Sequence, residues 1–235
     1  MDRQQLDCEE YARRIQFHTD EVPEILVEWL ERGDWQSCLD MGCGDGALLN
    51  ALHRRGFFEG KSAYAADSSE TRMDSVRKLD KGFNCLVCDA CHTQLPDGSI
   101  DFLVSTQVIE HVESDADMVR EIDRILSPKG TVYLSTVFKK RYGWYFYRCN
   151  GKWTIDPTHL REYTADGQLL PLFKRHGFEL MENKKTLDSR PIVDAVLRRV
   201  GAGRNIYSNR LLRSMRKIRI PIPGYYNWEM VWRRK

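Results

Sequence analysis

The stretch CLDMGCGDG, residues 38–46, constrains the fold of this 235-residue chain more than any other. It follows an apolar run and places glycines at every second position, so no side chains separate its backbone from whatever lies against it. Its strand, turn and helix context is typical of nucleotide-binding loops, but the spacing G-x-G-x-G differs from the G-x-G-x-x-G of dinucleotide folds. Asp40 and Asp45 flank the turn. Carboxylates there would repel a pyrophosphate but suit a ligand with an ammonium or sulfonium cation.

Apolar runs with the pattern of strands alternate with amphipathic runs from residue 34 to residue 138. We expect strands at 37–42, 61–67, 83–90, 99–106 and 130–138, and helices at 46–56, 68–82 and 113–130. Ser114 is placed to cap the third of these helices, and Pro128 to stop it. Alternating strands and helices predict a doubly wound, mostly parallel sheet with helices on both faces. Such sheets bind ligands at the carboxyl ends of their strands.

The whole chain is expected to form one domain in three parts. Residues 1–33 are predicted to be a helical cap, residues 34–138 the cofactor-binding core, and residues 139–235 a set of acceptor-side insertions and last strands. Within the last part, 178–188 and 227–235 have strand-like patterns. A chain of this length that is 42% hydrophobic can bury a sizeable core.

Charge and cysteine content limit where such a domain works. The 36 basic and 34 acidic residues nearly balance, so overall charge does not indicate a partner. The first residues lack the apolar segment of a secretory signal, and no run approaches the ~18 apolar residues of a membrane span. Seven cysteines without an export signal predict free thiols in a reducing cytoplasm.

Two further aspartates stand where predicted strands end. Asp67 closes the second strand, where an acid can accept hydrogen bonds from both hydroxyls of a ribose. Asp89 closes the third strand, where an acid and a neighbouring amide can meet the edge of an adenine. A dinucleotide-binding domain uses the same kind of turn and is the alternative at this point.

From about Cys38 to Phe138 the sequence resembles the class I S-adenosylmethionine-dependent methyltransferases, of the kind called methyltransferase type 11 or 12. Five segments in the family's order carry the resemblance: LDMGCGDG, AADSS, CDA, DFLVSTQVIEHV and EIDRILSPKGTVYLST. Each is weak alone, but in this order and at this spacing they are specific. The resemblance implies a Rossmann-like seven-stranded sheet with an antiparallel last strand, and 178–188 and 227–235 could supply its sixth and seventh strands.

The resemblance also implies which residues hold S-adenosylmethionine. The backbone of the glycine turn would line the methionine part, and the acid before the turn would orient the turn or meet the amino group. The residue after the fourth strand would lie beneath the sulfonium, the acid after the second strand would hold the ribose, and the end of the third would recognise the adenine. The glycine turn consists of Gly42, Cys43 and Gly44, and the acid before it is Asp40. The residue after the fourth strand is Gln107, and the acid after the second strand is Asp67, with Ser68 beside it. The end of the third strand consists of Asp89 and Ala90.

Two histidines near the predicted cleft are candidates for catalysis, His111 in IEHVE and His159 in DPTHLREYT. Methyl transfer depends largely on positioning and desolvation. A base is needed only when the acceptor must lose a proton, and imidazole titrates in the useful range. The alternative for His111 is packing at a helix start beneath the cofactor loop. The alternative for His159 is fixing its own loop by hydrogen bonding, and Tyr163 is a candidate to shape the pocket.

QVIEHV and THLREYT also resemble the Hen-type small-RNA 2′-O-methyltransferases, in which two glutamates and two histidines hold a divalent metal. Glu110, His111 and His159 match three of those positions, whereas Gln107 replaces the first glutamate. Losing one anionic ligand weakens a site for a hard cation, so we expect no metal. A metal-dependent RNA methyltransferase is the alternative.

The stretch CLVCDACH has the spacing of a metal cluster in Cys85, Cys88, Cys91 and His92. Cys85 and Cys88 fall on a predicted strand, where positions three apart face opposite sides. Zinc-binding pairs of this spacing lie on tight turns instead. We therefore expect these cysteines to pack in the core and no structural metal to be present.

The segment from residue 190 to 219 contains nine basic residues and one acid. Within 206–219 a helical pattern separates apolar from basic positions: Leu211, Met215 and Ile218 against Arg210, Arg213, Arg216 and Lys217. We expect a basic amphipathic helix whose apolar side anchors it by burial. Such a helix suits an anionic membrane surface, an anionic lipid-linked substrate or RNA, and its alternative is a plain lid with a solvated basic face.

These features together predict a cytoplasmic methyltransferase, peripheral at the membrane if the basic helix binds lipid. Its acceptor is expected to be a small or lipid-linked molecule methylated at oxygen. RNA methylation is the first alternative. A protein that binds the cofactor without turnover is the second, and the acids at 40, 67 and 89 argue against it.

Overall fold

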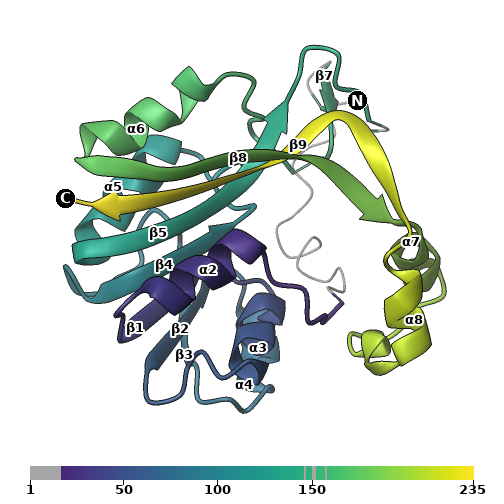
Figure 1. Ribbon diagram of the computed structural model, residues 1–235, viewed down its shortest axis with the longest axis horizontal. Helices are drawn as coiled ribbons and strands as arrows, with labels where there is room; N and C mark the ends of the chain where they lie inside the picture. Colours follow the sequence, from purple (N-terminus) through teal and green to yellow (C-terminus); the bar gives the residue numbers. More distant parts are fainter. Residues whose placement is uncertain (1–16, 146, 150–151, 157) are drawn as a thin grey trace.

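The computed structural model describes residues 17–145, 147–149, 152–156 and 158–235. Within this part the main sheet consists of seven strands: β1 (Ser37–Met41), β2 (Ser62–Asp67), β3 (Asn84–Val87), β4 (Ile100–Thr106), β5 (Leu126–Lys139), β8 (Phe178–Pro191) and β9 (Arg219–Arg234). Their order across the sheet is β3-β2-β1-β4-β5-β9-β8 (Figure 1). The strands from β3 to β5 are parallel, and β9 is antiparallel to both of its neighbours. The predicted Rossmann-like sheet and its antiparallel last strand are confirmed.

Helices lie on both faces of this sheet (Figure 1). They are α2 (Glu24–Arg32), α3 (Ala47–Arg54), α4 (Glu70–Arg77), α5 (Asp115–Ile125) and α6 (Leu170–Arg175). The Ser69 hydroxyl caps α4 by accepting the Arg72 N–H, and Ser114 caps α5 by accepting the Asp117 N–H. The cap predicted at Ser114 is therefore present. The prediction that Pro128 stops this helix is wrong, because α5 ends at Ile125 and Pro128 lies within β5.

Alternating side chains of the strands divide the core into two layers. One layer packs α5 and α6 against residues such as Leu39 and Leu103, and the other packs α2, α3 and α4 against residues such as Cys38 and Phe102. Cys85 of β3 packs against the second layer, and Cys88, directly after β3, packs against the first; both residues are partly buried. The two thiols thus face different layers, as predicted, but they are half-buried beside the core rather than buried inside it.

The described part of the predicted helical cap, residues 17–33, is helical only in its second half. Residues 1–16 lie outside the described part, and residues 17–23 contain no helix. Among residues 17–33, α2 is the one helix; it follows Pro23, is capped by Gly33 and buries Leu26, Trp29 and Leu30. The apolar spacing was therefore informative for the second half of the predicted cap.

The long strands β8 and β9 extend beyond the rest of the sheet and carry an insertion at their far end (Figure 1). This insertion, residues 192–218, is called the lid. It contains α7 (Ile192–Arg199), the 3₁₀ turn η2 (Ile206–Ser208) and α8 (Arg210–Met215). Its own small core consists of Val193 and Tyr207, which pack with Phe17. A separate hairpin of β6 (Tyr147–Cys149) and β7 (Lys152–Thr154), which the sequence patterns did not predict, lies before the loop that carries His159.

The predicted burial of the lid's apolar face is wrong. Leu211, Met215 and Ile218 are exposed, whereas Leu212 is the α8 residue that packs into the lid core. The helix is also shorter than the segment 206–219, because a 3₁₀ turn precedes it and β9 begins at Arg219. In the part of the chain that the structure describes, every helix is too short or too polar to cross a bilayer.

Candidate active site

The glycine turn lies between β1 and α3 and is fixed by its own neighbours. Gly42 and Cys43 donate their N–H groups to the Ala66 carbonyl at the end of β2. Gly42 has a φ of +78°, and a Cβ there would lie 2.3 Å from a methyl carbon of Val108, in the loop after β4. The absence of a side chain at Gly42 thus lets the turn pack directly against Val108 as well as against any ligand. This contact joins the turn to the loop that carries Gln107 and His111.

Asp40, the second-last residue of β1, is a candidate to bind a cationic group of a ligand. Its side chain is buried, and its Oδ1 has no hydrogen-bond partner among the described residues. Burial, together with the nearby Asp67 carboxylate, raises the pKa of Asp40 to about 7. An unsatisfied buried acceptor is costly, so a ligand ammonium group at this position would fit the residue.

Asp67, at the end of β2, is held in place by three donors. Its two carboxylate oxygens accept the N–H of Gly44 and the N–H of Ser69, both at 3.0 Å. The Arg72 guanidinium lies 3.5 Å from Oδ2, and both side chains of this ion pair are largely buried. The carboxylate is therefore oriented by the glycine turn and by the start of α4, which brings the predicted ribose acid against the predicted methionine site. Arg72 has no role assigned by the sequence motifs.

The remaining predicted cofactor contacts lie at neighbouring strand ends. Asp89 is exposed, and its Oδ1 accepts the Cys91 N–H at 2.7 Å, which leaves its other oxygen available. Gln107 follows β4 with a φ of +55°, an unusual value for a residue with a side chain, and its amide donates to Asn227 Oδ1. Ser68 is exposed and Ala90 half-buried. The ligand contacts of these four residues stay predictions.

The loop that carries His159 is clamped onto the loop after β4. The Arg161 guanidinium donates to the carbonyls of Ile109, Val112 and Glu113, and the N–H groups of Leu160 and Arg161 both donate to the Glu110 carbonyl. One arginine with several donors in a fixed fork can hold three carbonyls at once. These contacts bring His159 beside His111, although 47 residues separate them in the sequence. No motif assigned this role to Arg161.

His159 is oriented by a buried glutamate. Its Nδ1 lies 3.2 Å from Glu162 Oε1, which also accepts the Thr154 hydroxyl and the Ile155 N–H. Lys139 lies 3.3 Å from the other oxygen of Glu162. Burial opposes ionisation, but the hydrogen bonds from His159, Ile155 and Thr154 prevail and lower the pKa of Glu162. An ionised carboxylate accepts a hydrogen bond from the Nδ1–H of His159, and this bond directs the other ring nitrogen away from Glu162.

His111 is held in the same way by a different partner. Its Nδ1 lies 3.3 Å from the Thr158 carbonyl and 3.2 Å from the Thr158 hydroxyl, which itself donates to Asp156. Both Thr158 oxygens therefore act as acceptors, so Nδ1 carries the proton and Nε2 is the basic nitrogen. Burial and the adjacent His159 lower the pKa of His111 to about 4, so the ring is neutral near pH 7.

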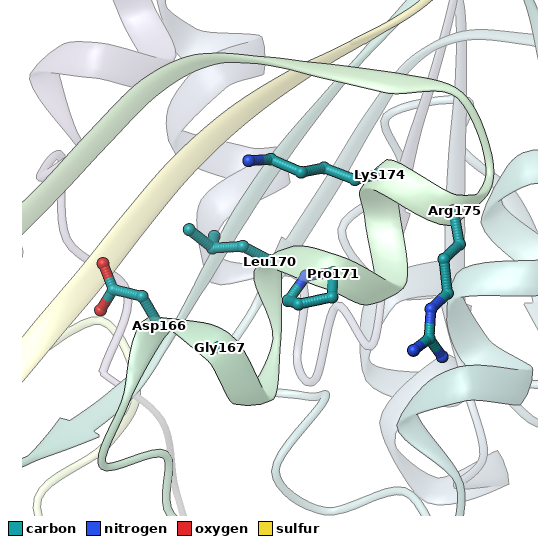
Figure 2. Close-up of a pocket in the computed structure, with 6 residues that line it drawn as sticks. All are labelled: Asp166, Gly167, Leu170, Pro171, Lys174 and Arg175. Carbon is teal, nitrogen blue, oxygen red and sulfur yellow. The ribbon is translucent and has the colours of Figure 1, made fainter.

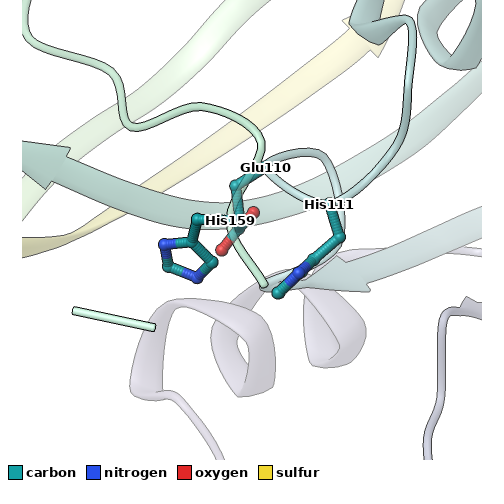
Figure 3. Close-up of side chains that lie close together, drawn as sticks. All are labelled: Glu110, His111 and His159. Atoms are coloured by element: carbon teal, nitrogen blue, oxygen red, sulfur yellow. The ribbon is translucent and has the colours of Figure 1, made fainter. Parts of the chain in front are cut away.

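Glu110, His111 and His159 form a compact cluster (Figure 3). One ligand atom from each residue lies within 4.8 Å of the others, and the two imidazole rings are 4.8 Å apart at their centroids. Glu110 is fully buried; its Oε2 accepts the Thr136 hydroxyl, whereas its Oε1 has no partner among the described residues. Burial raises the pKa of Glu110. These groups could share a proton with an acceptor or hold a divalent cation, and the expectation of no metal stays a prediction.

Tyr163 lies outside this cluster. It belongs to the hydrophobic core and donates its hydroxyl to Asp115, so the structure gives it a packing role rather than a place in the cluster.

A hollow on the surface of α6 is lined by Asp166, Leu170 and Lys174, among others (Figure 2). Asp166 is paired there with Lys185. Among the residues that the structure describes, the group of candidate metal ligands is the one around Glu110, not one in this hollow.

Comparison with known proteins agrees with this geometry. Residues 39–134, which run from β1 into β5, match the family model described as a methyltransferase domain. A Mycobacterium tuberculosis protein named "probable S-adenosylmethionine-dependent methyltransferase" is 32% identical over 144 residues, which is 60% of this chain and 47% of that protein. A ubiquinone biosynthesis O-methyltransferase of Pseudomonas paraeruginosa is 28% identical over 126 residues, or 50% of this chain and 52% of that enzyme. The chain thus spans about half the length of these curated relatives.

Solved structures show that the likeness in fold extends over most of the chain. An S-adenosylmethionine-dependent methyltransferase of Mesorhizobium loti has a TM-score of 0.57 and 22% identity, over 92% of this chain and 98% of that one. The [4+2]-cyclase SpnF has a TM-score of 0.62 and 16% identity, over 94% and 86% of the two chains. Because a cyclase shares the fold, these neighbours establish the architecture alone. From the sheet order and the solved structures, the chain has the class I S-adenosylmethionine-dependent methyltransferase fold, and its residues 39–134 match the methyltransferase-domain family.

Proposed function

We propose that this chain is an S-adenosylmethionine-dependent methyltransferase that methylates an oxygen of a small-molecule or lipid-linked acceptor. When bound, S-adenosylmethionine supplies a methyl group carried on a sulfonium. The relatives' names and the intact strand-end acids support the cofactor, and the cluster of Glu110, His111 and His159 supports an acceptor that loses a proton.

Residues at the strand ends would hold the cofactor. Asp40 has an unpartnered buried oxygen for the amino group, and Asp67 has a fixed carboxylate for the ribose hydroxyls. Gly42 to Gly44 would face the methionine part, with Gln107 near the sulfonium and Asp89 with Ala90 at the adenine. Two acids close to a cationic ligand stabilise its charge, and a cation in turn favours their ionised forms.

The observation that supports the choice of oxygen is the contact of His111 Nδ1 with the carbonyl and hydroxyl oxygens of Thr158. Thr158 holds the proton of its Nδ1, so the neutral ring presents a basic Nε2. A hydroxyl acceptor must lose its proton during methyl transfer, whereas a neutral amine can attack before it is deprotonated. His159, oriented by Glu162, is the second candidate base, and the two rings are close enough for either to serve one acceptor.

The test is methyl transfer by the full chain from tritium-labelled S-adenosylmethionine to 3,4-dihydroxybenzoate and to a bacterial lipid extract. We expect labelled product with the methyl group on oxygen. Replacing His111 or His159 with alanine should lower kcat by about 10²–10⁴-fold, the usual contribution of a positioned base, and leave cofactor affinity unchanged. A methyl group found on nitrogen or carbon, or histidine variants as active as the wild type, would contradict the assignment.

Cofactor binding without transfer to either acceptor class would favour the regulatory alternative. Calorimetry with S-adenosylhomocysteine distinguishes this result from a failure to bind the cofactor. The proposed location is the cytoplasm, with the lid as the part that meets a membrane.

The cluster also favours a second candidate, metal-assisted methylation of an RNA 2′-hydroxyl. Glu110, His111 and His159 offer three ligand atoms within 4.8 Å of one another, and each histidine has a hydrogen-bond partner on its Nδ1, as metal-binding histidines commonly do. Against this, Gln107 would have to replace an anionic ligand, and its amide is already bonded to Asn227. Activity on a small RNA that needs manganese would establish this candidate instead.

A further inference from the structure

The lid and the start of β9 carry an unusual concentration of exposed apolar side chains. Seven of the thirteen large apolar residues that are exposed in the described part of the chain lie between residues 192 and 220. They are called the lid patch: Ile192, Val196, Val200, Leu211, Met215, Ile218 and Ile220. Val200 and Leu211 are each 70% exposed and Ile218 is 61% exposed, which is unfavourable for groups of this size unless something covers them.

The spacing of the lid patch places its members on one side of each helix. In α7 and the turn after it, the exposed apolar residues recur at intervals of four, from Ile192 through Val196 to Val200. In α8 and the turn after it, Leu211, Met215 and Ile218 follow the intervals of four and three that also mark one helical side. The N–H of Ile192 donates to the carbonyl of Ile218, so the two rows meet at the base of the lid.

A different set of residues already fills the inner side of the lid. Val193 and Leu197 of α7 and Leu212 of α8 pack with Tyr207 and Phe17. Arg216 is also turned inward, where it pairs with Asp194. The residues of the lid patch therefore take no part in the lid core and form a second, exposed apolar surface.

Charge around the lid patch narrows the choice of partner. Residues 190–219 have a formal charge of +8, whereas the whole chain has +2, so the remainder is net negative. Arg199, Arg210 and Lys217 are exposed, and the described residues offer them no acidic partner within ion-pair distance. Apolar residues interspersed with unpaired cations are typical of elements that lie in the interface of an anionic bilayer.

We propose that the lid patch docks on an anionic membrane surface, with its apolar side chains between the lipid headgroups and its free cations on the phosphates. A second copy of the chain is a poor occupant, because a symmetric contact would bring two segments of charge +8 together. The negative remainder of the molecule is repelled by the same surface, so the charge distribution orients the lid toward the bilayer.

Docking at this position would place the membrane next to the candidate active site. Arg204 of the lid lies 3.4 Å from Asp45 in the glycine turn, and the His18 N–H donates to the Arg204 carbonyl. This step rests on the proposed function and names its acceptor more narrowly, as a molecule met at the bilayer. The docking itself does not depend on catalysis.

The experiment is co-sedimentation of the full chain with vesicles of equal parts phosphatidylglycerol and phosphatidylcholine, compared with phosphatidylcholine alone. The wild type should bind the anionic vesicles at low salt and release them at high salt, because screening weakens exposed charges. A double variant, Leu211→Ser with Met215→Ser, should bind at least about tenfold more weakly. Each substitution removes a large apolar side chain that would otherwise be buried between the lipid headgroups. A triple variant, Arg199→Gln, Arg210→Gln and Lys217→Gln, should lose at least as much.

Matched controls lie elsewhere on the surface. Met181→Ser removes an exposed apolar residue of β8, and Lys174→Gln with Arg175→Gln removes exposed charges of α6, at the other end of the sheet from the lid (Figure 1). Both should bind vesicles like the wild type. Absence of wild-type binding at low salt, equal losses in the controls, or binding to RNA in place of vesicles would overturn the proposal.

Calorimetry with S-adenosylhomocysteine on the same proteins separates the two proposals. Intact cofactor binding without vesicle binding refutes the docking surface and leaves the proposed function standing. Vesicle binding without cofactor binding refutes the proposed function and leaves the docking surface standing. Concentration-dependent dimers in sedimentation velocity that disappear in the Leu211→Ser and Met215→Ser variant would assign the patch to self-association and also overturn membrane docking.

Discussion

Replacing Asp67 with asparagine tests the cofactor site at one functional group. The carboxylate accepts the Gly44 and Ser69 N–H groups at 3.0 Å each, and Arg72 lies 3.5 Å away. Asparagine has the same shape but offers one oxygen and one NH₂ group. One of the two backbone donors would then face a donor, and Arg72 would lose its ionic partner.

The magnitude of the loss follows from the change in charge. A hydrogen bond to a charged group contributes ~1.5–3 kcal/mol and one between neutral groups ~0.5–1.5 kcal/mol, so each ribose hydroxyl loses about 1 kcal/mol or more. Two hydroxyls together lose about 2 kcal/mol, which corresponds to roughly 30-fold in affinity. The buried donors left by the same change should lower the free energy of unfolding by about 1–3 kcal/mol.

The assay is titration calorimetry with S-adenosylhomocysteine, together with urea unfolding to show that the variant is folded. Asp74→Asn is the matched control, because Asp74 is an exposed acid on α4 that pairs with Arg77 at the surface. The control should bind like the wild type. Unchanged affinity of Asp67→Asn, in a preparation whose wild type binds, would refute the ribose assignment.

Further outcomes follow from other parts of the site. The acidic limb of kcat/KM should lie near pH 4 if His111 is the base, since burial lowers its pKa to about 4, and a limb near 6.5 in a pH–rate profile would point to another group. Between pH 6.5 and pH 4 the unfolded chain binds a proton at His111 that the folded protein does not bind, because folding lowers the pKa of His111 from 6.5 to about 4. The free energy of unfolding should therefore fall as the pH falls through this range. Urea unfolding of the wild type should show this loss, and His111→Gln should show less of it. Methyl transfer should continue in the presence of a chelator, because Gln107 replaces an anionic ligand; activity lost to the chelator and restored by manganese or magnesium would reverse that expectation. Gly42→Ala should lower the free energy of unfolding by about 2–5 kcal/mol, because its Cβ meets Val108 and its φ is +78°, while Gly60→Ala, with open space around it, should cost only about 1–2 kcal/mol; equal losses would refute the contact argument.

Local patterns were sufficient to predict the central part of the fold. Asp40 and Asp67 lie in the last two residues of β1 and β2, and Asp89 follows β3 by two residues. These positions could be located because apolar runs stop there and a turn residue or helix cap follows. Their side-by-side arrangement follows from the rule that ligands bind at the carboxyl ends of parallel strands. The pairing of Gly44 with Asp67 depends on the same local geometry.

The parts that were missed depend on contacts between distant segments. Arg161 and Glu162 position His159 through partners that lie up to 52 residues away, and no spacing within THLREYT reveals those partners. The lid was misinterpreted for a related reason. Periodicity shows that Leu211 and Met215 share a side, but only the packing of Leu212 against Tyr207 decides which side is buried.

The central claim is that the strand ends from β1 to β4 bind S-adenosylmethionine beside the cluster of Glu110, His111 and His159. A crystal structure of the full chain with S-adenosylhomocysteine tests it most directly. The ribose hydroxyls should lie within hydrogen-bond distance of Asp67, the amino group near Asp40, and the sulfur on the side of Gln107 and His111. An adenosyl group bound elsewhere, or a ribose that does not touch Asp67, would contradict the account.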